Sequence, residues 1–139
     1  MAHDSTLPGV LVASISAGPI FTTATTLALA YGMLPASVAV SELALLAWMF
    51  GVTVGGMIGL FLALIPNLLG SAALARLGEA WPEARAPLLW VVTGAALAGI
   101  VALAFGADNA AGFGLVVTGA ANAGLCRRGL RWADDEEGL

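Results

Sequence analysis

Four long stretches without a charged side chain constrain this sequence more than any other feature. They cover residues 5–41, 43–75, 86–107 and 109–126. About 20 apolar residues suffice to cross the roughly 30 Å hydrocarbon core of a bilayer as a helix. The first two stretches exceed that length, and the last two are close to it. The pattern therefore predicts four transmembrane helices.

The composition favours a membrane protein over other classes. Hydrophobic residues make up 60% of the 139 residues and charged residues only 10%, whereas a soluble domain carries about 25% charged residues. The net charge is −4, and the five basic residues, all arginine, are too few for a nucleic-acid surface. One cysteine and one histidine provide neither a disulfide framework nor a zinc cluster. We therefore expect no catalytic residues, no cofactor, no metal and no nucleic-acid partner.

Turn and capping residues predict where the helices end. Gly106 is a natural C-terminal cap, because glycine tolerates the left-handed conformation found there. Asp108 or Asn109 is a natural N-cap for the helix that follows, and Pro87 suits the first turn of the helix before it. The expected helices lie at about residues 7–31, 36–65, 88–105 and 110–126.

Pro66 predicts that the second helix ends or kinks there, at about residue 65, because proline lacks a backbone N–H and clashes with the preceding helical turn. We expect the residues that follow to form a cytoplasmic loop over 67–86. Apolar side chains recur every fourth residue within 68–81, which is typical of an interfacial helix. The middle loop is therefore predicted to contain one short interfacial helix.

The arginines predict the orientation. All five fall on one side of a four-helix arrangement, and the connections on the other side, 32–35 and 106–109, contain none. Cytoplasmic loops are enriched in arginine and lysine, so both termini, including the tail at 127–139, are expected in the cytoplasm. The expected cytoplasmic anchors are Arg76, Arg85, Arg127, Arg128 and Arg131.

The resulting fold class is all-α: one integral membrane domain over 1–139, built as a four-transmembrane-helix bundle of two hairpins. The alanine-rich, lysine-free composition is typical of a bacterial chain. We therefore expect the protein in the bacterial inner membrane.

Small residues form a narrow face on each predicted helix. Helices in a bilayer associate through such faces, because small side chains let the backbones approach closely. The tandem GxxxGxxxG of the second helix, a glycine zipper, packs either inside one bundle or against another subunit. The predicted helix-packing residues are Gly51, Gly55 and Gly59 on the second helix and Ala95, Gly99 and Ala102 on the third.

Few polar side chains fall inside the predicted spans, and the candidates for a polar or ion site are Glu42, Thr22, Thr25 and Asn122. Glu42 lies in the first turns of its helix, where the helix dipole favours a carboxylate. It is interpreted as an interfacial anchor or, alternatively, as a proton or cation site. The hydroxyls of the first helix either line a polar path or bond to carbonyls of their own helix. Asn122 is expected to hydrogen-bond to a neighbouring helix.

Two functions remain open on these residues. The favoured one is a non-enzymatic accessory or assembly subunit of a membrane complex, which would contact the lipid bilayer and other membrane subunits. The alternative is a homo-oligomeric small transporter or channel, in which the partner is a second copy and the polar candidates line the path.

Overall fold

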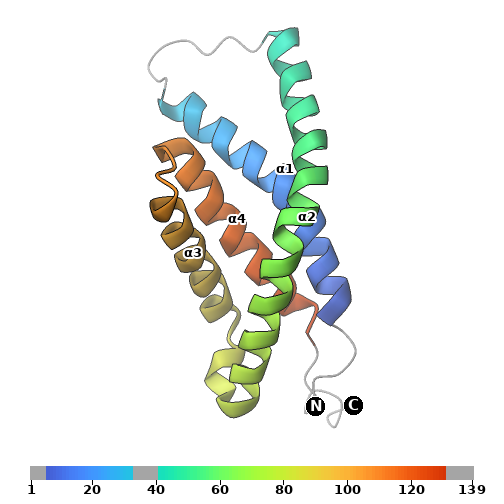
Figure 1. The fold of residues 1–139 in the computed structure, drawn as a ribbon, viewed down its shortest axis with the longest axis vertical. Helices are drawn as coiled ribbons and strands as arrows, with labels where there is room; N and C mark the ends of the chain where they lie inside the picture. The colour runs from blue at the N-terminus through green and yellow to red at the C-terminus, as the bar shows by residue number, and fades with distance from the viewer. Residues whose placement is uncertain (1–5, 33–40, 131–139) are drawn as a thin grey trace.

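The structure is a computed structural model that describes residues 6–32 and 41–130. These residues form four long helices and one short 3₁₀ helix, so the predicted all-helical fold is confirmed. In chain order they are α1 (Thr6–Gly32), α2 (Glu42–Ala80), η1 (Pro82–Arg85), α3 (Pro87–Ala104) and α4 (Asn109–Arg128). Figure 1 shows their arrangement: α1 packs against both α2 and α4, and α3 packs against α4.

Three of the four described long helices, α1, α2 and α3, are long and apolar enough to cross a membrane. This indicates a membrane protein. The fourth, α4, has 20 residues, and glycine and alanine make up much of its length. It does not reach the same hydropathy, because small side chains contribute little apolar surface.

The turn between α3 and α4 follows the predicted capping residues. Gly106 has a φ of +62°, the left-handed conformation that glycine adopts without steric cost. One oxygen of the Asp108 side chain accepts a hydrogen bond from the backbone N–H of Ala111 at 2.7 Å. Asp108, and not Asn109, is therefore the N-cap of α4, and Pro87 occupies the first turn of α3 as expected.

α2 differs from the prediction. It runs from Glu42 through Pro66 to Ala80 without a break, so the predicted end near residue 65 and the separate interfacial helix in a loop over 67–86 are wrong. Proline removes only one backbone hydrogen bond, and in a bilayer the cost of leaving many backbone groups unpaired favours an unbroken helix. Figure 1 shows that α2 changes direction partway along its length.

The start of α2 lies later than predicted. Ser41 is the N-cap, and its side chain accepts a hydrogen bond from the backbone N–H of Ala44 at 3.1 Å. The predicted helical residues 36–40 lie outside the described residues.

α1 and α2 cross at glycines. A Cβ on Gly18 would overlap the backbone carbonyl of Gly55, and a Cβ on Gly59 would lie 2.6 Å from the Gly18 nitrogen. Beyond this crossing the two helices diverge (Figure 1). The N-cap Ser41 and all residues of α2 from 42 to 50 are exposed as a result.

α3 and α4 also cross at glycines, since a Cβ on either Gly94 or Gly119 would overlap the backbone carbonyl of the other. A small buried cluster joins the start of α1 to the start of α3 and the end of α4. Its members are Val10, Ala13, Trp90, Cys126 and Leu130. These contacts fix α1, α3 and α4 relative to one another.

α2 and α3 share no extensive contact in the described part of the chain. α1 and α4 lie side by side between them. α2 packs against α1, and α3 packs against α4. This arrangement leaves a space between α2 and α3 with α1 and α4 as its floor.

Candidate functional site

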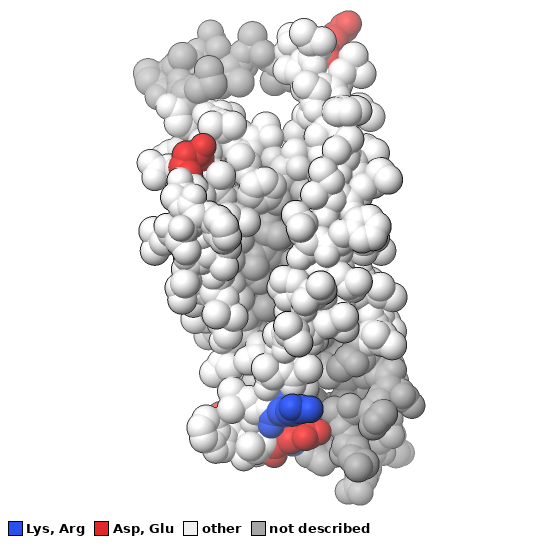
Figure 2. Space-filling model, viewed as in Figure 1, with Lys and Arg blue, Asp and Glu red and all other residues white. Residues whose placement is uncertain are grey.

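A cleft of about 720 Å³ opens between α2 and α3, and all four long helices contribute to its lining. Figure 2 shows the surface hollowed along this gap. Apolar side chains such as Phe21, Leu62, Leu97 and Val101 cover most of its wall, and none of the described residues that line it is charged.

Most polar side chains in the cleft are already satisfied by hydrogen bonds. The Asn67 Nδ2 donates to Ser14 Oγ at 3.1 Å and thereby joins α2 to α1. The Ser71 hydroxyl donates to the Leu68 carbonyl at 3.1 Å, within its own helix. The Thr118 hydroxyl donates in the same way to a carbonyl of α4 at 2.7 Å. These groups stabilise the walls of the cleft and offer little to a ligand.

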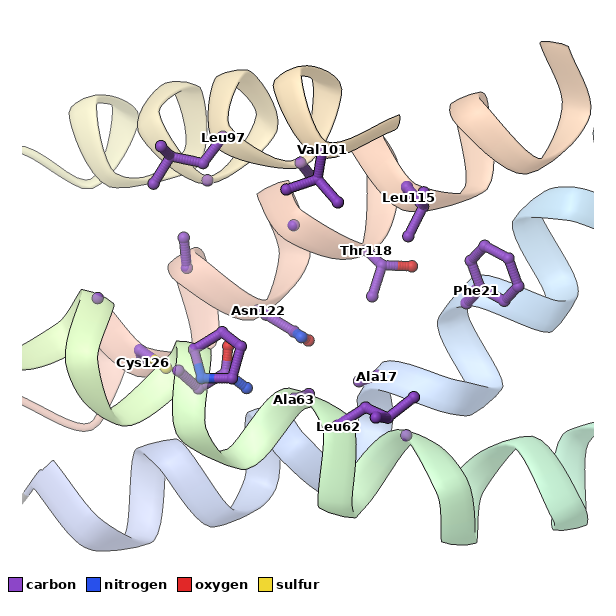
Figure 3. A pocket seen from close by; sticks show the side chains of 18 of the residues that line it. Ala17, Phe21, Leu62, Ala63, Leu97, Val101, Leu115, Thr118, Asn122 and Cys126 are labelled. Carbon is purple, nitrogen blue, oxygen red and sulfur yellow. The ribbon is translucent and has the colours of Figure 1, made fainter. Parts of the chain in front are cut away.

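Asn122 differs from these three residues. Its side chain is only 5% exposed, and its Oδ1 is buried without a hydrogen-bond partner among the described residues. Figure 3 shows the Asn122 side chain pointing from α4 into the cleft. The bond to a neighbouring helix predicted for this residue is therefore not made by its oxygen. A buried unpaired acceptor costs about 1–3 kcal/mol, which marks Asn122 as the polar centre of the site.

The other predicted polar candidates do not converge on one site. Thr22 lines the cleft, and its hydroxyl lies 3.5 Å from the Gly51 carbonyl oxygen. Thr25 instead faces Gly114 of α4, and its Oγ1 is buried without a partner in the described ranges. Glu42 is the exposed first residue of α2, beyond the crossing with α1. Of the four candidates, the structure brings only Thr22 and Asn122 to the same cleft.

Two other hydroxyls of α1 form hydrogen bonds within their own helix. Ser16 donates to the Val12 carbonyl at 2.8 Å, and Thr26 donates to the Thr22 carbonyl at 2.8 Å. Both therefore follow the interpretation in which a hydroxyl bonds to its own helix.

The GxxxGxxxG motif of α2 lies against α1 of the same chain. A Cβ on Gly51 would lie 3.4 Å from Thr22 Cγ2, one on Gly55 would lie 2.9 Å from Thr22 Oγ1, and Gly59 faces Gly18. These three glycines of α2 therefore contact α1 and are not free on the surface of the molecule.

The predicted face of α3 meets α4 only in part. A Cβ on Gly99 would lie 3.6 Å from Val116 Cγ2, and Ala102 is buried, while Ala95 is half-buried. The closest approach lies at Gly94, which the sequence reasoning missed. The small-xxx-small spacing of Gly94 and Ala98 was the signal for it.

The predicted arginine anchors gather where α2, η1 and α4 end. The Arg85 Nε donates to the Gly78 carbonyl at 2.9 Å, and the Arg127 Nε donates to the Arg85 carbonyl at 2.7 Å. Arg76 precedes the last turn of α2, Arg128 is the last residue of α4, and Arg131 lies outside the described residues. On the face in Figure 2, the charged side chains of the described residues lie near the two ends of the molecule.

No group of three histidine, cysteine, aspartate or glutamate residues in the described ranges is placed to hold a metal ion. No known protein family, curated protein or solved structure is similar enough to this chain to match it.

Proposed function

We propose that this protein is a non-enzymatic accessory or assembly subunit of a membrane complex, and that a transmembrane helix of another subunit packs against the first part of α2. The observation that carries the proposal is the exposure of residues 41–50. Within this segment Leu43, Leu46 and Phe50 are 76%, 62% and 71% exposed.

The length of α2 supports the same proposal. Its 39 residues span about 58 Å at 1.5 Å per residue, nearly twice the roughly 30 Å hydrocarbon core. A helix longer than the bilayer is thick tilts or projects beyond it, and packing against neighbouring helices sets the tilt. α1 supports α2 from Gly51 onward, where Thr22 of α1 meets α2. A helix from another subunit would support the remaining part.

We also propose that α4 crosses the membrane beside α3, which gives four spans with both termini in the cytoplasm of a bacterial cell. α4 is as long as a span requires, at about 30 Å, and it packs against a helix that is apolar enough to cross. Asp108 precedes its first residue, and Arg127 and Arg128 end it. This charge distribution follows the positive-inside rule for a cytoplasmic C-terminus.

The homo-oligomeric transporter or channel has less support. Glu42 lies beyond the α1–α2 crossing, whereas Thr22 and Asn122 lie in the cleft. A conduction path would require all three side chains to line the same continuous pore.

Photo-crosslinking in the native membrane tests the proposed function. A photoreactive side chain at Leu46 is compared with one at Ile100 of α3, because both native side chains are 62% exposed. The expected result is a crosslink from position 46 to a different polypeptide and crosslinks to lipid alone from position 100. Crosslinks from position 46 to a second copy of this chain would favour the transporter or channel. Lipid products alone at both positions would contradict the accessory function.

A further inference from the structure

We propose that the cleft between α2 and α3 is a binding site for a neutral lipid alcohol, with the lipid hydroxyl donating a hydrogen bond to Asn122 Oδ1. This site is separate from the start of α2, so the inference does not depend on the proposed accessory function.

The size and surroundings of the cleft define the apolar part of the ligand. Its volume of about 720 Å³ falls within the roughly 300–1,000 Å³ typical of small-molecule sites. It opens between two helices that share no extensive contact in the described residues, one of which, α2, has no buried residue in its most apolar segment. A ligand dissolved in the bilayer therefore reaches the site sideways, without entering water.

The absence of charge among the described lining residues defines the ligand as neutral. A charged headgroup in this apolar surrounding would lack a counter-charge, and burying an unpaired charge is costly. Ordinary phospholipid headgroups, which are charged or zwitterionic, are therefore poor occupants of the floor of the cleft.

Asn122 defines the polar part of the ligand. Its Oδ1 is the buried acceptor without a partner that points into the cleft, and a hydrogen-bond donor satisfies it. A hydroxyl both donates and accepts, so it pairs with whichever end of the carboxamide it meets. A ketone or an ester, which only accepts, would leave Oδ1 unpaired.

The position of Asn122 along α4 agrees with this ligand. It precedes Arg128, the last residue of α4, by about 9 Å along the helix. This distance places the amide below the level of the arginines and within reach of a hydroxyl at the polar end of a neutral lipid. The hydrocarbon part then lies along Phe21, Leu97 and Val101, which line the cleft.

Two approaches test the proposal on the full chain in mild detergent. The first extracts and identifies the neutral lipids that remain bound after purification from the native membrane. The second measures the apparent Kd of octadecanol and of octadecane by native mass spectrometry, because the two probes differ only in the hydroxyl. A membrane hydrogen bond of average strength predicts about threefold tighter binding of the alcohol.

Two variants separate the hydrogen bond from the shape of the cleft. In Asn122→Leu the octadecanol affinity should fall to that of octadecane, while octadecane binding stays unchanged and shows that the cleft still forms. In Gly70→Leu both probes should bind more weakly, because Gly70 lines the cleft and a Cβ there meets no atom within 4 Å.

The proposal is overturned if the native protein binds both probes equally, if neither binds, or if the alcohol preference persists in Asn122→Leu. It is also overturned if the purified protein holds only phospholipid. Loss of a copurifying polypeptide in Gly70→Leu would show that a protein helix occupies the cleft instead. None of these results depends on the crosslinks at Leu46, so the two proposals can fail separately.

Discussion

Gly18 sets the closest approach between two helices in this protein. A Cβ at Gly18 would overlap the Gly55 carbonyl, whereas a Cβ at Gly70 would meet no atom within 4 Å. We expect Gly18→Ala to lower the free energy of unfolding by about 1–3 kcal/mol, because the helices must move apart. Gly70→Ala, in the same kind of helical backbone, should raise it by about 0.5–1 kcal/mol. Denaturation in mixed micelles measures the free energy of unfolding of both variants. Equal effects at the two sites would contradict the close approach of α1 and α2 at Gly18.

Asp108 supplies a second test at the level of one residue. Its carboxylate caps α4 by accepting a hydrogen bond from the Ala111 N–H, whereas Asn109 is already the first helical residue. Asp108→Ala should cost about 1 kcal/mol of stability, the usual value of an N-cap, and Asn109→Ala should cost much less. The same micelle denaturation compares them. A larger loss in Asn109→Ala would show that the cap is misassigned.

The helix ends at the turn between α3 and α4 were predictable from the sequence because local residues determine them, whereas the equally local N-cap Ser41 of α2 was missed. Gly106 and Asp108 cap their helices through their own backbone or side chain, and the structure confirms both. The effect of Pro66 depends on more than local sequence, because proline either ends a helix or is tolerated in one according to the environment. For the same reason the role of Asn67 was not predicted. The sequence places Asn67 in a loop, whereas in the structure it lies in α2 and donates a hydrogen bond to Ser14.

The continuity of α2 through Pro66 predicts an energetic link between Asn67 and Ser14. A double-mutant cycle with Asn67→Ala and Ser14→Ala should give a coupling energy of about 0.6 kcal/mol, the average for hydrogen bonds between membrane helices. Asn67→Ala combined with Ser16→Ala is the matched control, because Ser16 bonds to carbonyls of its own helix. No coupling between Asn67 and Ser14 would contradict the contact and favour the loop predicted from the sequence.

At the scale of the whole molecule, the two predicted hairpins agree with the packing of α1 against α2 and of α3 against α4, but the packing of one hairpin on the other could not be predicted. Small residues occur on each of the four helices, and such faces are compatible with many partners, so their presence does not specify which helices meet. The cleft follows from one outcome of that pairing, in which α1 and α4 separate α2 from α3. Asn122 could be named from the sequence as a polar residue in a span. Its unpaired oxygen in a cleft requires the arrangement of all four helices.

The topology of the chain depends on α4, the least apolar of the long helices described. If α4 crosses, reporter fusions after Thr6 and Leu139 should both signal the cytoplasm, and a fusion after Asp108 should signal the opposite side. The reason is that Arg127 and Arg128 would hold the end of a crossing α4 at the cytoplasmic surface, while contact with α3 would compensate for the weak hydropathy of α4. Replacing both arginines with glutamine should therefore give a mixed signal at Leu139 and leave Asp108 unchanged. An external signal at Leu139 in the native sequence would reduce the protein to three spans.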